Sequence, residues 1–160
     1  MSIDDENPGV GAIELSNDEA SAVSETALAF GAALPCDRQG PYRALAAAAG
    51  EGTVPADQVA DLERVCALAL ETGKARQLGR AEVEQLLAAV YRRTPGGRAL
   101  QADVADVNRA LAQLAGRELE SVRLMWNMPG RYGLSLTVQG ISLLLALEPD
   151  GLRVRTLQAG

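Results

Sequence analysis

Apolar residues recur along the first two thirds of the chain at the three- and four-residue spacing of amphipathic helices. The clearest example is the segment 81–93, whose apolar positions share one helical face: Val83, Leu86, Leu87, Val90 and Tyr91. A second clear seam runs along the helix that carries Leu100, Val104, Val107, Leu111 and Leu114 and ends at Gly116. Further helices are expected at 16–34, 42–49 and 55–73, which makes about five helices.

Capping and breaking residues support these boundaries. Ser16 followed by Glu19 forms a capping box at the start of the first helix. The segment 35–41, which begins and ends with proline, breaks the chain before the second helix. The third helix has Pro55 in its first turn and ends at Gly73.

From Glu118 onward the apolar period changes from that of a helix to the two-residue period of strands. Turn signals at Pro129-Gly130, at 139–140 and at 149–151 divide this part into four strands. Short turns between consecutive strands predict an up-and-down antiparallel meander. The fold class is therefore α+β: about five helices followed by a C-terminal four-stranded antiparallel β-meander.

The loop lengths also predict the register of the strands. A two-residue loop at 139–140 places Val138 opposite Ile141, and the loop around Pro129 places Trp126 opposite Tyr132. On the fourth strand, Leu152, Val154 and Thr156 are expected to share one side. One face of the sheet then becomes apolar, and we expect the helices to cover it: Leu124, Leu134, Leu136, Leu143 and Leu145.

The opposite face of the sheet is a candidate interface with another protein or with a second copy of the chain. Residues 143–147 are apolar at every position, so this face also requires cover at its centre. Arginines flank that centre on the outer strands. The candidate interface residues are Arg123, Met125, Leu144, Ala146, Arg153 and Arg155.

Charge is distributed unevenly along the chain, whose net charge is −6. Residues 1–37 contain eight acidic residues and no lysine or arginine, which leaves thirteen acidic and fifteen basic residues in the remainder. We expect an acidic flexible tail at 1–14, a helical region at 15–116 and the β-meander at 117–160, together forming a single domain. The overall acidity argues against nucleic-acid binding, which requires a basic surface.

The sequence indicates a cytoplasmic protein without a membrane segment. No apolar run is long enough to cross a bilayer, and the N-terminus lacks the features of a secretory signal. The two cysteines, Cys36 and Cys66, do not form a disulfide framework.

Most catalytic chemistry is missing from the composition. The chain has no histidine, which excludes Ser-His and Cys-His nucleophile systems and removes the commonest metal ligand. No phosphate-binding or dinucleotide-binding glycine motif is present. Carboxylate pairs such as Asp103 with Asp106 have the spacing of a solvated helical face. We therefore expect no metal, no cofactor and no catalytic residues.

The most basic stretch is a candidate anion site. Residues 74–98 contain six basic residues and two glutamates, and 92–98 joins the end of one helix to the start of the next. Unpaired N–H groups at a helix start, together with glycines, could hold a phosphate or a carboxylate. The candidate ligand-binding residues are Arg92, Arg93, Gly96, Gly97 and Arg98. The alternative is an ordinary basic helix end followed by a turn.

Two further hypotheses follow from these features. The acidic N-terminus could dock on the basic 74–98 stretch, or it could be a solubilising tail that touches nothing. For function, we favour a non-enzymatic protein-interaction module such as an assembly factor, adaptor or regulator. The alternatives are a small-molecule or anion-binding protein that uses the Arg92–Arg98 loop or the polar sheet face and, least favoured, a small enzyme with carboxylate or arginine chemistry.

Overall fold

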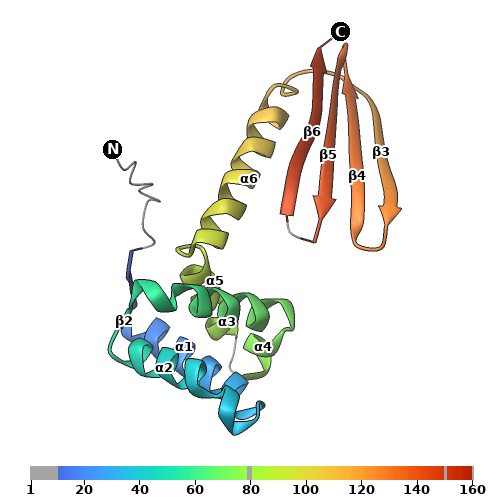
Figure 1. Cartoon of the computed structure of the whole chain (residues 1–160). Helices are drawn as coiled ribbons and strands as arrows, with labels where there is room; N and C mark the ends of the chain where they lie inside the picture. Colours follow the sequence, from blue (N-terminus) through green and yellow to red (C-terminus); the bar gives the residue numbers. More distant parts are fainter. Residues whose placement is uncertain (1–10, 79–80, 150, 160) are drawn as a thin grey trace, which may run out of the picture. The chain divides into compact units, whose positions relative to one another are not determined.

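The computed structural model of the chain describes residues 11–78, 81–149 and 151–159 and confirms the α+β class. The chain divides into two compact units, residues 1–98 and 99–160. The expectation of a single domain stays a prediction. Figure 1 shows the elements of each unit in the colours of the sequence.

The helical unit contains five α-helices and the start of a sixth in its described residues. Its elements are β1 (Ile13–Glu14), α1 (Asn17–Ala32), η1 (Cys36–Arg38), α2 (Gly40–Gly50), β2 (Thr53–Val54), η2 (Ala56–Gln58), α3 (Val59–Glu71), α4 (Lys74–Leu78), α5 (Ala81–Tyr91) and the first turn of α6 (Pro95–Ala112). The short α4 was not predicted from the sequence. The other helices lie close to their expected positions.

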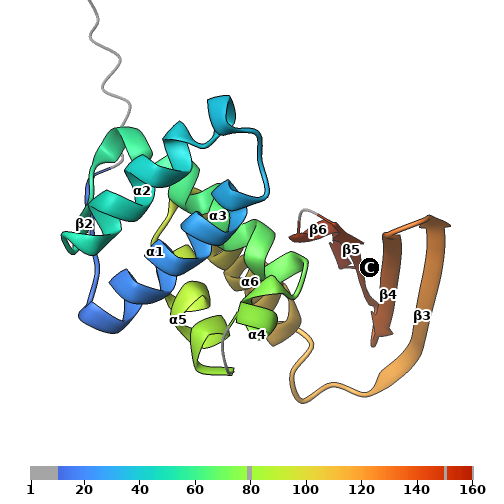
Figure 2. The ribbon, with the colours of Figure 1, turned by 90° about the horizontal axis from the view of Figure 1, so that it is seen from below.

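The core of the helical unit is made of small and aliphatic side chains. Helix α1 packs against α2, α3 and α5 (Figure 2). Fully buried side chains include Val23, Leu45, Val54, Leu62, Cys66, Leu87 and Val90. Because alanines such as Ala27 and Ala49 stand between them, the helices approach closely without aromatic residues in the centre.

The capping box at the start of α1 is confirmed. The Glu19 backbone N–H donates to the Ser16 hydroxyl at 3.3 Å, and the Ser16 N–H donates to the Glu19 carboxylate at 2.9 Å. This reciprocal pair satisfies two N–H groups that the helix itself cannot pair.

Regular secondary structure begins earlier in the chain than the sequence predicted. Ile13 and Glu14, which the sequence placed in the flexible tail, form strand β1 and pair with Val54 and Thr53 of β2. Ile13 is buried in the helical core. Residues 1–10 of the predicted tail lie outside the described residues.

The sheet unit contains the predicted meander. Strands β3 (Leu119–Met128), β4 (Arg131–Val138), β5 (Ile141–Glu148) and β6 (Gly151–Ala159) pair antiparallel in the order β3-β4-β5-β6. The predicted pairs Val138 with Ile141 and Trp126 with Tyr132 are both present. At 139–140 both residues have positive φ, as a two-residue hairpin loop of type I′ requires.

A β-bulge changes the predicted pattern of the last strand. Val154 pairs with Leu145, but the next paired residue on β6 is Thr156, opposite Leu144. The unpaired residue is Arg155. A bulge shifts the alternation by one position, so Thr156 moves to the second face and Leu157, opposite Leu143, joins the apolar face. The expectation that Thr156 shares a side with Val154 was wrong.

Only part of the apolar sheet face is covered. Val107, Ala110 and Leu111 of α6, with Leu114 after it, pack on a cluster from β4, β5 and β6: Leu134, Leu136, Leu143, Leu145, Leu152 and Val154. Leu145 is 2% exposed, but Leu124 of β3 is 67% exposed. The expectation that helices cover Leu124 was therefore wrong.

A single helix is narrower than a four-stranded sheet, which explains why β3 is left uncovered. One helix with its side chains is about 10–12 Å wide. The outer strands of a four-stranded sheet lie about 14 Å apart, because neighbouring strands are about 4.8 Å apart. Within the sheet unit, α6 lies nearest β6, and β3 is the strand farthest from it (Figures 1 and 2). None of the helices in the described residues is both long and apolar enough to cross a membrane.

Candidate functional site

On the helical unit, a hollow of about 580 Å³ lies between α1 and α5. Its lining comes from two helical faces that are more than fifty residues apart in the sequence: Asp18, Ser21, Ala22 and Glu25 from α1, and Glu82, Val83, Gln85 and Leu86 from α5. We call this hollow the α1/α5 groove. Its volume lies in the range of sites that hold a ligand or part of a partner.

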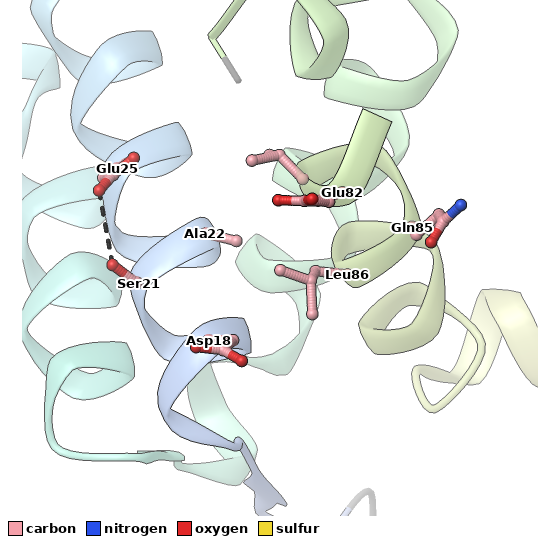
Figure 3. A pocket seen from close by; sticks show the side chains of 8 residues that line it. Asp18, Ser21, Ala22, Glu25, Glu82, Gln85 and Leu86 are labelled. Atoms are coloured by element: carbon pink, nitrogen blue, oxygen red, sulfur yellow. Dashed lines mark hydrogen bonds between the residues drawn. The ribbon is translucent and has the colours of Figure 1, made fainter. Parts of the chain in front are cut away.

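The α1/α5 groove combines an apolar floor with an acidic rim. Figure 3 shows Ala22 and Leu86 pointing toward each other across the groove, while Glu82 extends toward α1 and Gln85 points away. Asp18 and Glu25 lie on the α1 side. The groove therefore offers apolar contact at its centre and three carboxylates around it.

These three carboxylates have no basic partner in the described part of the chain. The ion pairs within 4.0 Å include none to Asp18, Glu25 or Glu82. Glu25 accepts one hydrogen bond, from the Ser21 hydroxyl at 3.4 Å (Figure 3). By contrast, Glu84 on the same helix pairs with Arg76, whose hydrogen bond lowers the pKa of Glu84. Among the described residues, no basic side chain therefore pairs with the carboxylates of the rim.

The predicted anion-binding residues lie together at the junction of α5 and α6, where Arg93, Gly96 and Gly97 contact other groups of the chain. The Arg93 guanidinium donates to the backbone carbonyl of Glu14 and pairs with the Glu19 carboxylate, both at 2.7 Å. These contacts tie the segment just before α1 to the end of α5. Glu14 is the last residue of the segment expected to dock on the basic stretch, and residues 1–10 lie outside the described chain.

The glycines of this junction are also in contact with the chain itself. The Gly96 N–H donates to the Glu63 carboxylate of α3 at 2.7 Å, and the Gly97 N–H donates to the Thr94 hydroxyl at 3.2 Å. A Cβ on Gly97 would overlap the carbonyl oxygen of Tyr91, and one on Gly96 would lie 2.6 Å from Glu63 Oε1. An incoming anion would have to displace Glu63. Anion binding at Arg92–Arg98 stays a prediction.

The contact between Arg93 and Glu19 also affects protonation. Partial burial raises the pKa of Glu19, but hydrogen bonds from the Ser16 backbone and from Arg93, together with the charge of Arg93, outweigh it and lower that pKa below its ordinary value of 4.5. Glu19 therefore caps α1 and pairs with Arg93 in its charged form. Glu63 and Glu19 are partners of this junction that the sequence did not reveal, because tertiary packing brings them there.

The second face of the sheet holds the predicted interface residues. Ala146 is buried and Leu144 is half-buried, while Met125 is 39% exposed and its Cε lies 3.1 Å from the position of a Cβ on Gly133. Met125 thus covers the backbone at Gly133 beside Leu144. Around this centre, Arg155 pairs with Glu148 at 2.7 Å and Arg153 lies 4.0 Å from Asp103. Arg123, on β3, is exposed. Use of this face as an interface stays a prediction.

Strand β3 exposes Leu124, which was expected to be covered, together with two other apolar residues. Val122, Leu124 and Trp126 are 52%, 67% and 68% exposed and lie on the face that α6 covers elsewhere. We call these three residues the β3 strip. Trp126 is the chain's one tryptophan.

The two cysteines lie in different environments, and one of the predicted carboxylate pairs has a basic neighbour. Cys36 is exposed and Cys66 is buried, and burial raises the pKa of the Cys66 thiol to about 12. Asp106 pairs with Arg109 at 2.8 Å, as expected for a solvated helical face. No group of three or more His, Cys, Asp or Glu side chains in the described residues is arranged to hold a metal ion.

Comparison of the chain with protein-family models, with curated proteins and with solved structures finds no match.

Proposed function

We propose that this chain is a non-enzymatic protein-interaction module whose α1/α5 groove binds a basic, amphipathic segment of another protein. The observation that carries the proposal is the combination, in one groove, of an apolar floor and three carboxylates without basic partners in the described residues. The expected cytoplasmic location is a prediction that goes with this proposal.

The shape of the groove supports a helical partner. An amphipathic helix binds between two helices by placing its apolar side chains on the groove floor. Ala22, Val83 and Leu86 provide that floor. Lysine or arginine residues beside the apolar stripe of the partner would then face Asp18, Glu25 and Glu82.

Ion pairs and apolar contacts in the groove differ in how much free energy of binding they contribute. An exposed ion pair contributes only about 0.2–1 kcal/mol, whereas burial of apolar surface contributes about 25 cal/mol per Å². Most of the affinity must therefore come from the apolar floor. The carboxylates select a basic partner over an acidic one and speed its association, and salt should weaken both effects.

Calorimetric titration tests this proposal with two synthetic helical peptides. Both carry leucines at the i, i+3, i+4, i+7 spacing; one has lysines beside this stripe and the other has glutamates. We expect the lysine peptide to bind, with an affinity that falls as salt rises, and the glutamate peptide not to bind. Equal binding of the two peptides, or no binding of either, would contradict the proposal.

Charge reversal at Glu25 tests whether the lysine peptide binds in the α1/α5 groove. Glu25→Lys replaces an attraction by a repulsion and should weaken the lysine peptide roughly tenfold. The matched control is Glu51→Lys, because Glu51 is an exposed residue at the C-cap of α2, away from the groove lining, where a lysine suits the helix dipole. Equal weakening by both variants would show that net charge, and not the groove, holds the peptide.

A further inference from the structure

Strand β3 presents an uncovered face and a free edge at the same place. Among the described strands it pairs only with β4, so every second residue along it directs its backbone N–H and C=O away from the sheet. The pairing with β4 is irregular at Leu119/Ser121 and at Trp126/Met128 but uninterrupted over the six residues between these points. A six-residue regular edge is long enough to pair with another strand.

The two edges of the sheet differ in their protection against such pairing. Edge strands of soluble proteins carry charges or bulges that prevent pairing with other chains. The middle of β6 has both, since Arg153 and Arg155 lie there and Arg155 forms the bulge. The regular part of β3 has no bulge and a single charged residue, Arg123, beside the exposed β3 strip. The backbone edge of β3 can therefore pair with another strand, whereas charges and a bulge protect the edge of β6 from such pairing.

The size of the exposed surface suits an interface. Two aliphatic side chains and a tryptophan, each half to two-thirds exposed, leave on the order of 300 Å² of apolar surface, which is comparable to the largest patch on a typical monomer. A dimer interface buries about 800 Å² on each partner, with an apolar centre and a polar rim. The β3 strip would supply the centre, and the backbone edge with Ser121, Arg123 and Asn127 would supply part of the rim.

The sequence of β3 is complementary to itself. When two antiparallel copies are related by a two-fold axis at Leu124, the two Leu124 residues lie opposite each other. Val122 of each copy then lies opposite Trp126 of the other, on the same apolar face. Pairs of an aromatic and a β-branched residue stabilise antiparallel strands. Arg123 lies opposite Met125, so no like charges face each other within the regular segment.

We infer that two copies of this chain associate through β3, so that their sheets join edge to edge into one eight-stranded sheet. The occupant is a second copy because the same five residues, 122–126, supply both halves of the contact, in a register that places no like charges directly opposite each other. This surface is separate from the α1/α5 groove, so failure of either proposal leaves the other intact. It also differs from the second sheet face that the sequence suggested.

Sedimentation velocity of the full chain over a range of concentrations tests this inference. We expect the wild type to shift from one chain to two as the concentration rises from about 1 μM to about 1 mM. Leu124→Lys should raise the dimer dissociation constant at least about tenfold, because it places two lysines opposite each other at the axis. Leu157→Lys, on the apolar face of β6, is the matched control and should leave that constant unchanged.

Circular dichroism of each variant separates loss of dimer from loss of fold. A wild type that remains a single chain throughout the range would overturn the inference. Dimerisation that survives in folded Leu124→Lys, or that is lost equally in folded Leu157→Lys, would also overturn it.

Disulfide formation tests the register independently of these substitutions. In a Cys36→Ser background, Leu124→Cys places two thiols opposite each other, and facing residues of antiparallel strands have the Cα separation of about 4.5–5.5 Å that a disulfide requires. Oxidation should produce a covalent dimer of Leu124→Cys and not of Leu157→Cys in the same background. Absence of that dimer, or equal dimer in both variants, would overturn the two-fold contact at Leu124.

Discussion

Gly97 is required at the start of α6 by what lies beside its α-carbon. The carbonyl oxygen of Tyr91 occupies the place of a Cβ, and the neighbouring Gly96 lies against the Glu63 carboxylate. From the sequence, these glycines could allow an anion to approach closely, or they could belong to an ordinary turn. The sequence could not show that a glutamate thirty-three residues before Gly96 contacts it, because only the packing of α3 places Glu63 there.

Substitution of this glycine gives a direct test at the scale of a single residue. Gly97→Ala should lower the free energy of unfolding by about 1–3 kcal/mol, because the new methyl group forces the junction of α5 and α6 apart. Gly50→Ala is the control, since a Cβ at Gly50 meets nothing within 4 Å and alanine favours the helix by up to about 1 kcal/mol. Urea unfolding measures both. An unchanged stability in Gly97→Ala would show that the junction is not tightly packed.

The charge on Glu19 should make part of the stability depend on pH. Its folded-state pKa is lowered, so the stabilisation is complete above the ordinary value of 4.5 and is lost as pH falls through the lower folded value. Glu19→Gln keeps the hydrogen-bonding shape of the capping box but removes the charge. We expect the variant to be less stable by on the order of 1 kcal/mol at neutral pH and equal to the wild type near pH 2.

Chemical unfolding at the two pH values measures this difference, and Glu51→Gln, at an exposed C-cap, serves as the control without such a contact. A difference between Glu19→Gln and the wild type that is the same at both pH values would show that the charge has no role.

At the scale of elements, alternation and loop length were sufficient to predict the register of β3, β4 and β5, but not the bulge in β6 or which part of the sheet a helix covers. Alternation reports that Leu124 and Leu145 share a face. It does not report how much of that face a helix reaches, and α6 reaches β4 to β6 only. The bulge at Arg155 was also hidden, because Arg155 continues the alternation of the strand while its backbone leaves the pairing.

Two leucine truncations on this face should therefore have unequal effects. Leu145→Ala should lower the free energy of unfolding by about 2–5 kcal/mol, as truncation of a buried leucine does. Leu124→Ala should change it by less than about 0.5 kcal/mol under conditions where the chain is a monomer, because that side chain is two-thirds exposed. Guanidinium unfolding at low protein concentration measures both. Equal losses would mean that β3 is covered as fully as β5.

At the scale of the molecule, the candidate function depends on a juxtaposition that the linear sequence does not display. The acidic N-terminal segment was visible as a charge anomaly, and Asp18 and Glu25 belong to it. Glu82, in contrast, lies in a stretch whose net charge is positive, so the charge pattern does not distinguish it. Packing of α5 beside α1 brings the three carboxylates together around one groove. Part of the charge of the acidic N-terminal segment is thereby concentrated at a defined surface.

Mapping of backbone amide shifts by NMR during titration with the lysine peptide tests the proposed function most directly. We predict that the largest shift changes fall in two segments, 18–25 and 82–86, which line the α1/α5 groove. Glu25→Lys should reduce these changes, and Glu51→Lys should preserve them. Changes confined to 92–98 or to 121–126, or no changes at a saturating concentration of peptide, would contradict the assignment of the groove as the binding site.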